Sequence, residues 1–204
     1  MWQLNNCPQF AENCDGVAFH YYAGNIEQTL LIKEKYPHLK LHFTEGGPRL
    51  YDHYDTDWCK WGIMINKVLN CGYSSFTGWN LLLDEKGGPN VGPFFCGGLV
   101  TLNRTTGTLS YSGQYKVFNH FSRFIKRNAD VLKCKILNQG KGMFEFGKAY
   151  TEPSVSVVIN EDGSLILSVV NANSYKCQLK FFFENKCWYV ESLPDSVVTV
   201  VCEK

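Results

Sequence analysis

The hydrophobic pattern of the chain changes its period near residue 130, and this change limits the folds that are open to it. From residue 16 to about residue 127, short apolar runs alternate with amphipathic stretches, which is typical of βα units around a parallel sheet. Beyond Asp130, apolar and polar residues alternate one by one, with a turn at residues 160–163 that predicts a β-hairpin. We therefore predict two domains: an α/β domain over 1–130 and an antiparallel β-sandwich over 131–204.

The first domain is predicted to hold about three βα repeats. Its expected strands cover residues 17–22, 39–44 and 75–83, and its expected helices cover 26–36, 58–71 and 114–127. A loop rich in Gly and Pro follows at 84–98, before a hairpin-like stretch at 103–112. Three repeats cannot close a barrel of eight, and an open parallel sheet would leave its edges exposed. We therefore expect this domain to be incomplete, either as a piece of a longer polypeptide or as a truncated gene model.

Composition excludes several classes of function. A formal net charge of +1, without long runs of like charge, gives no electrostatic reason to expect nucleic acid or an anionic membrane as a partner. The sequence has no apolar run of about 18 residues that would predict a membrane span, and its first residues do not resemble a secretion signal. Nine cysteines without a Cys-x-x-Cys pair argue against zinc and thioredoxin-like sites, and leave disulfides or buried thiols open. The triplet Asn103-Arg104-Thr105 is a glycosylation sequon or a chance occurrence.

Polar side chains interrupt the apolar pattern where the predicted strands end. His20 and Tyr22 follow the first strand, Glu45 follows the second, and Trp79 lies toward the end of the third. In (β/α)8 barrels the chemistry is carried at the carboxyl ends of the strands. A carboxylate that precedes two glycines can reach into a cleft, because the glycines carry no side chains that would block it. A surface glutamate in a turn has the same pattern.

These motifs together resemble glycoside hydrolase family 30, which includes the glucosylceramidases. The resemblance covers nearly the whole chain and rests on Phe19-His20-Tyr21-Tyr22-Ala23-Gly24, on Phe43-Thr44-Glu45, on the Trp-Asn to Gly-Gly-Pro-Asn stretch at 78–90, and on residues 115–124. It implies the C-terminal part of a (β/α)8 TIM barrel followed by an antiparallel β-sandwich domain.

The resemblance also implies a retaining β-glycosidase, in which Glu45 is the nucleophile and a second glutamate is the acid and base. In the family that second glutamate lies in an Asn-Glu-Pro motif, and this chain contains no such motif. We therefore expect the chain by itself to be inactive.

Four further positions match residues of the family's pocket, namely His20, Tyr22, Trp79 and Asn90. By this resemblance they bind substrate, and the Tyr22 phenol hydrogen-bonds the nucleophile. The resemblance implies no metal and no organic cofactor, a glycoside or glycolipid substrate, and a lysosomal or extracellular location.

The substrate stays open between members of the family. We expect hydrolysis of β-glucosidic bonds in glucosylceramide or related glycosides, and the alternatives are a β-1,6-glucanase or a β-xylosidase. The residues after Glu45, Gly46-Gly47-Pro48-Arg49, depart from those of the vertebrate glucosylceramidases. A non-catalytic carbohydrate-binding remnant, in which Glu45 persists without its partner, is a further alternative.

Overall fold

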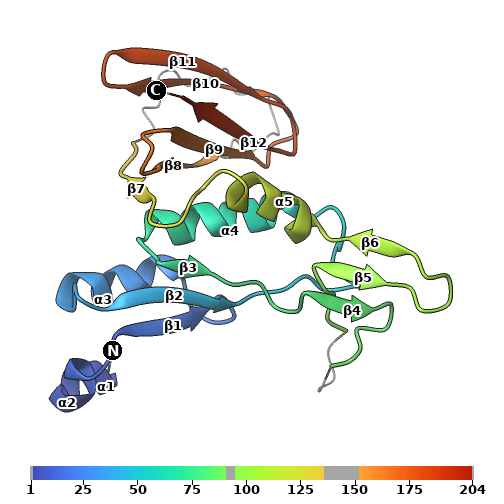
Figure 1. Cartoon of the computed structure of the whole chain (residues 1–204), viewed down its shortest axis with the longest axis horizontal. Coiled ribbons are helices and arrows are strands. Elements are labelled where there is room, and N and C mark those ends of the chain that lie inside the picture. Colours follow the sequence, from blue (N-terminus) through green and yellow to red (C-terminus); the bar gives the residue numbers. More distant parts are fainter. Residues whose placement is uncertain (1, 91–94, 136–151, 204) are drawn as a thin grey trace, which may run out of the picture. The chain divides into compact units, whose positions relative to one another are not determined.

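The computed structural model describes residues 2–90, 95–135 and 152–203. It is a mixed α/β structure that divides into two compact units. Unit 1 comprises Met1–Tyr54 and Lys67–Ser112, and unit 2 comprises Asp55–Asn66 and Gly113–Lys204. The arrangement of strands and helices within each unit can be followed in Figure 1.

The first sheet of unit 1 has three parallel strands. They lie in the order β1 (Gly16–His20), β2 (Lys40–Glu45) and β3 (Ser75–Phe76). The central strand β2 buries Leu41 and Phe43 completely, and the Phe43 ring stacks on Phe76 with 4.3 Å between centroids. Because the strands are parallel, their carboxyl ends share one edge of the sheet. The register shifts after Phe19, so that His20 pairs with Glu45 at that edge.

Short helices connect these strands, as the βα pattern predicts. The helical elements before β3 are α1 (Trp2–Asn6), α2 (Pro8–Glu12), the 3₁₀ helix η1 (Ile26–Thr29), α3 (Leu30–Lys35) and α4 (Trp58–Asn70). Helix α4 begins after Asp57, whose carboxylate accepts a 2.6 Å hydrogen bond from the Trp61 indole. It is followed by Gly72 in the left-handed region at φ +71°, a conformation typical of a glycine just beyond the end of a helix. Across the described ranges, no helix combines the length and the apolar character of a membrane span.

The predicted third strand over 75–83 is wrong. Only Ser75–Phe76 pairs with β2, and β4 (Leu82–Asp84) belongs to a second sheet. Asn80 lies between them at φ +61°, a left-handed conformation that interrupts an extended strand. In the second sheet β4 runs parallel to β5 (Val100–Leu102), which pairs with β6 (Leu109–Tyr111) in an antiparallel hairpin (Figure 1).

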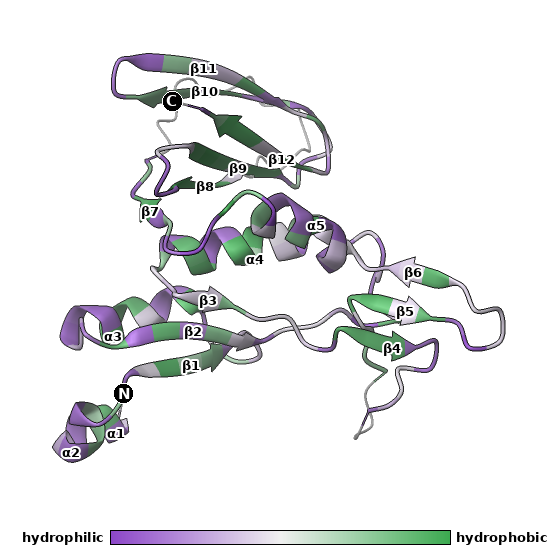
Figure 2. Ribbon diagram, in the orientation of Figure 1, coloured by the Kyte–Doolittle hydropathy of each residue, from purple (hydrophilic) through white to green (hydrophobic). Residues whose placement is uncertain are grey.

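Unit 2 contains a four-stranded antiparallel sheet and a separate two-stranded hairpin. The first has the order β12 (Ser196–Cys202), β9 (Leu165–Asn171), β8 (Ser154–Ile159) and β7 (Asp130–Leu132), and the second pairs β10 (Cys177–Phe183) with β11 (Lys186–Ser192). The predicted hairpin across residues 160–163 is confirmed, since β8 pairs with β9 over its full length. Figure 2 shows the strongly apolar character of β9 and β12.

The core of unit 2 draws on both of its sheets. Val157, Leu167 and Val169 of the four-stranded sheet pack in one cluster with Val190 of the hairpin. All seven residues of β9 are buried, which fits a central strand with both faces covered. Helix α5 (Gly113–Ser122) is shorter than the predicted 114–127, and Phe124 and Ile125 close its end with hydrogen bonds to the carbonyl of Phe121.

All nine cysteines are free thiols, and their burial predicts which of them react. Burial raises the pKa of the Cys59 thiol to about 12, with a further contribution from Asp195, and it also raises the pKa of the Cys71 thiol. Cys7 and Cys187 are exposed. At about pH 8, iodoacetamide is expected to alkylate Cys7 and Cys187 in the native protein, and Cys59 and Cys71 only after unfolding. Peptide mass spectrometry measures this, and alkylation of native Cys59 as fast as Cys187 would contradict its burial.

Candidate active site

The carboxylate of Glu45 lies at the carboxyl end of β2, directly after the buried part of that strand. The Tyr22 hydroxyl donates a 2.8 Å hydrogen bond to Glu45 Oε1, and His20 Nε2 lies 3.8 Å from Oε2. The Glu45 side chain is 27% exposed, so it is held by neighbours and still reachable from solvent. A phenol and an imidazole thus lie against the two oxygens of this carboxylate.

Aromatic neighbours hold the Tyr22 ring in place. It packs against Tyr21 with 4.8 Å between ring centroids, and against His20 with an edge contact at 5.5 Å. Desolvation raises the pKa of the Tyr22 phenol well above its usual range, and the hydrogen bond to Glu45 and the charge of that carboxylate raise it further. The phenol therefore keeps its proton and acts as a hydrogen-bond donor to Glu45.

The titration of Tyr22 provides a test of this contact. An ordinary tyrosine loses its proton near about pH 10, and Tyr22 is expected to do so at a clearly higher pH. Because folding raises this pKa, the linked stabilisation is complete below about pH 10 and is lost as the pH rises through the folded-state pKa. The difference in phenolate absorbance between the wild type and Tyr22→Phe isolates this one group. Glu45→Gln should lower the pKa of Tyr22 only in part, since the desolvation remains, and a wild-type Tyr22 that titrates normally would contradict the contact.

Two glycines after Glu45 allow the chain to pass closely by Trp79. The Trp79 amide donates a 3.0 Å hydrogen bond to the carbonyl oxygen of Gly46. A Cβ atom on Gly47 would lie 2.7 Å from the Trp79 carbonyl oxygen, a distance that side chains do not tolerate. Trp79 is 43% exposed. The structure therefore ties the predicted site residue Trp79 to the loop that begins at Glu45.

A short antiparallel ladder fixes the same loop further along the chain. The Leu50 amide donates to Phe95 O at 3.2 Å, and the Gly97 amide donates to Pro48 O at 2.9 Å. Asn90 reaches this ladder through Cys96, since its side-chain amide lies 3.4 Å from the Cys96 sulfur.

Sequence reasoning missed Cys96, which also contributes to the electrostatic surroundings of Tyr22. A signal for it exists in hindsight: it is the cysteine of the Gly- and Pro-rich loop, between two phenylalanines and two glycines.

The loop that leads to Asn90 is held by Asp84. One carboxylate oxygen accepts hydrogen bonds from the amides of Gly88 at 2.7 Å and Lys86 at 3.0 Å, and the other lies 3.2 Å from Arg104 Nε. The bond from Gly88 and the other donors hold the pKa of Asp84 below its usual range. The carboxylate is therefore a structural acceptor for this loop.

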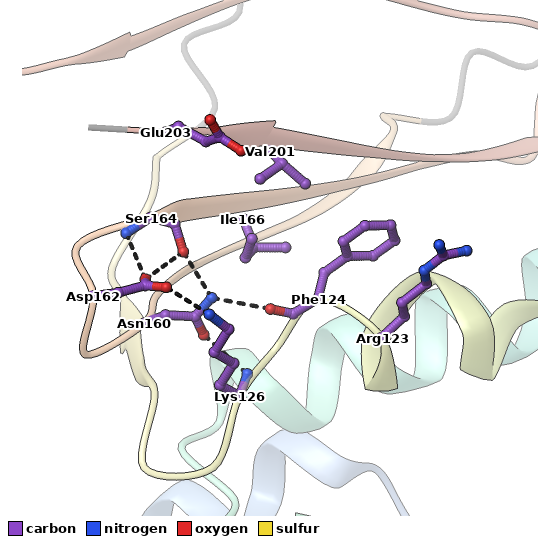
Figure 3. A pocket seen from close by; sticks show the side chains of 9 residues that line it. All are labelled: Arg123, Phe124, Lys126, Asn160, Asp162, Ser164, Ile166, Val201 and Glu203. Carbon is purple, nitrogen blue, oxygen red and sulfur yellow. Dashed lines mark hydrogen bonds and ion pairs between the residues drawn. The ribbon is translucent and has the colours of Figure 1, made fainter.

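Unit 2 contains a pocket of about 290 Å³ beside the β8–β9 turn (Figure 3). Several of its polar groups bond to one another: Asp162 accepts from Lys126 and Ser164, and Asn160 donates to the carbonyl of Phe124. These bonds close the turn onto the segment after α5. We interpret this pocket as a structural clasp, since Lys126, Asn160, Asp162 and Ser164 are joined by hydrogen bonds across it.

Two curated relatives are similar to this chain. A Caenorhabditis elegans protein with a provisional glucosylceramidase name is 28% identical over 140 residues, which are 64% of this chain and 27% of that protein. An endo-1,6-β-D-glucanase of Neurospora crassa is 26% identical over 161 residues, which are 76% of this chain and 32% of the enzyme. The chain thus spans about a third of the length of these relatives. No protein-family model matches it.

Solved structures share its fold. An endo-β1,6-glucanase superposes with a TM-score of 0.81 at 22% identity, over 99% of this chain and 45% of the enzyme. A family 30 endoxylanase from Clostridium papyrosolvens superposes with a TM-score of 0.69 at 15% identity, over 98% of this chain and 51% of the enzyme. Over the part of the relatives' length that it covers, the chain is therefore similar in sequence to a protein named as a glucosylceramidase and to an endo-1,6-β-D-glucanase, and it shares the fold of glycoside hydrolase family 30 enzymes.

Proposed function

We propose that this chain supplies the nucleophile of a retaining β-glycosidase, and that Glu45 is that nucleophile. The observation that carries the proposal is the 2.8 Å hydrogen bond from Tyr22 to Glu45, at the end of a parallel strand. Because the pKa of the Tyr22 phenol is raised, this phenol keeps its proton and is the donor to the Glu45 carboxylate. The family resemblance supports the same assignment.

The reaction follows from the chemistry of two carboxyl groups. Glu45 attacks the anomeric carbon and forms a glycosyl ester, while a second carboxyl group, about 5 to 5.5 Å from it, protonates the leaving oxygen. That second group then activates water, which releases the sugar with its configuration retained. Tyr22 donates to Glu45 Oε1, which leaves Oε2 as the attacking oxygen on the side of His20.

Aromatic and polar groups around Glu45 suit a sugar ring. Trp79 and Tyr22 offer partly exposed ring faces on which the apolar side of a pyranose can stack. His20 is 40% exposed and supplies ring nitrogens for hydroxyl groups. In this proposal Asn90 completes the polar rim from the loop held by Asp84.

The parallel sheet β1-β2-β3 is proposed to be the C-terminal part of a (β/α)8 barrel, and the strands of unit 2 a β-sandwich, with the domain boundary near residue 130. The family 30 structures support this, since the chain covers about half of their length. Such a part lacks the strand that bears the acid. A lysosomal or extracellular location is proposed with it.

The preferred substrate class is a β-glucoside of the glucosylceramide type, in line with the provisional name of the nematode relative. A β-1,6-glucan is the second candidate, because the Neurospora relative is an endo-1,6-β-D-glucanase. The two differ in the leaving group, a lipid alcohol or another sugar. Calorimetry can measure the affinity of the chain for ceramide-linked glucose and for a β-1,6-linked glucose oligomer. The ligand that binds more tightly indicates the substrate class.

The chain by itself is expected to hydrolyse no aryl β-glucoside. General acid catalysis contributes about 10²- to 10⁴-fold in rate, and the chain contains no Asn-Glu-Pro acid. The rate at which the purified chain releases the chromophore from the aryl glucoside measures this activity. A rate above the buffer blank would contradict the expectation that the chain is inactive without the acid.

An activated glycosyl fluoride tests the nucleophile separately. Fluoride leaves without protonation, so 2-deoxy-2-fluoro-β-glucosyl fluoride needs only the attacking carboxylate and forms a slowly hydrolysed ester. We expect one adduct per chain, located at Glu45 by peptide mass spectrometry. An adduct at another residue would contradict Glu45 as the nucleophile, and no adduct at all would favour a carbohydrate-binding remnant.

A further inference from the structure

The triplet Asn103-Arg104-Thr105 is a feature that the proposed hydrolysis does not use. It is the one Asn-x-Ser/Thr triplet among the 204 residues. Such a triplet accepts an N-linked glycan when it lies on the surface of a protein that enters the secretory route. Whether this triplet is suited to that role depends on its backbone and on the direction of its amide.

Asn103 begins the turn that joins β5 to β6. Its amide donates a 2.9 Å hydrogen bond to Thr108 O, and its carbonyl accepts a 2.7 Å hydrogen bond from Gly107 N. Residues 104–107 are all exposed between these two bonds. A Cβ atom on Gly107 would meet no atom within 4 Å, which shows that the turn projects into open space.

The side-chain amide of Asn103 has a fixed direction. Its Oδ1 accepts hydrogen bonds from the backbone amides of Thr105 and Thr106, both at 3.0 Å. Oδ1 and Nδ2 are the two branches of a planar carboxamide, the first an acceptor and the second a donor. Since both of these bonds end on Oδ1, the turn does not use Nδ2, which is the atom that carries an N-linked glycan.

We propose that Asn103 is an N-glycosylation site on the β5–β6 turn. Its Nδ2 attacks the anomeric carbon of a lipid-linked oligosaccharide pyrophosphate, the bond from that carbon to the pyrophosphate oxygen breaks, and Nδ2 loses one proton. The pyrophosphate lipid is the leaving group, and no oxidant or reductant takes part. The proposal rests on passage through the secretory route and not on hydrolysis, so the two stand or fall separately.

The simpler interpretation is that Asn103 is only a turn residue. Asparagine and aspartate both accept backbone hydrogen bonds in this way. The turn uses the backbone amide of Thr105 and not its hydroxyl, so it would form equally well with another residue at position 105. The sequon requires the hydroxyl of that residue, and this difference separates the two interpretations.

The test is expression of the full chain behind a cleavable secretion leader in insect cells. Two fractions are collected: secreted protein, and protein inside vesicles, where the membrane protects it from added protease. The intact mass of both is measured before and after treatment with peptide N-glycosidase. We expect a glycan mass on the wild type that the enzyme removes, with Asn103 converted to aspartate.

Matched variants separate the sequon from the turn. Thr105→Ala keeps Asn103 and both backbone donors, and is expected to lose the glycan completely. Thr105→Ser keeps a hydroxyl and should retain it, whereas Asn103→Asp keeps the turn acceptor and should lose it. Unmodified mass on the translocated wild type, or a glycan that survives in Thr105→Ala, would overturn the proposal. Neither result bears on the labelling of Glu45.

Discussion

Glu45→Gln is expected to abolish covalent labelling of the chain by 2-deoxy-2-fluoro-β-glucosyl fluoride. The amide has nearly the shape of the carboxylate and can still accept the hydrogen bond from Tyr22, but it has no negative charge with which to attack carbon. The labelling rate should fall roughly 10⁴- to 10⁶-fold, the range of losses when a member of a covalent catalytic unit is removed. Intact mass spectrometry over a time course measures it.

The control is the same change at an exposed glutamate. Glu34 lies on α3 and is exposed to solvent. Glu34→Gln alters the net charge equally and should leave the labelling rate at the wild-type value. If Glu45→Gln were labelled as fast as the wild type, the reacting carboxylate would lie elsewhere in the chain. Thermal unfolding of both variants checks that neither result reflects a loss of structure.

Local patterns predicted the elements that local chemistry determines. The β8–β9 hairpin follows from two strand-like runs around a turn that ends in Gly163, which lies in the left-handed region at φ +82°. Helix α4 follows from apolar residues at helical spacing, with Asp57 before it and Gly72 after it. In each case the residues that determine the element are neighbours in the chain.

The same reasoning failed where distant segments decide the structure. β4 pairs with β5, and β3 is limited to Ser75–Phe76, because Asn80 redirects the chain and the partner strand arrives many residues later. The bridge between Arg49 and Cys96 joins segments with no common pattern. The contact of Tyr22 with Glu45 likewise joins two strand ends, and the family resemblance indicated it where periodicity did not.

Asn171 also joins segments that are distant in the sequence. Its side chain is fully buried at the end of β9. The amide nitrogen donates to Tyr175 O at 2.8 Å, to Leu193 O at 2.9 Å and to Ser192 O at 3.3 Å. The oxygen accepts from Asn173 through both its backbone and its side-chain nitrogen. One side chain therefore holds the connection after β9 against the connection after β11.

Asn171→Ala is expected to destabilise unit 2 strongly. It leaves several buried donors and acceptors without their partner, and each such group costs about 1–3 kcal/mol. A total loss of at least about 3 kcal/mol lowers the unfolding temperature by roughly 6–12 °C for a chain of this size. Scanning calorimetry measures it. Asn119→Ala removes an exposed asparagine from α5, and should change stability by less than about 0.5 kcal/mol. Equal unfolding temperatures for the two variants would mean that the buried amide does not hold these connections together.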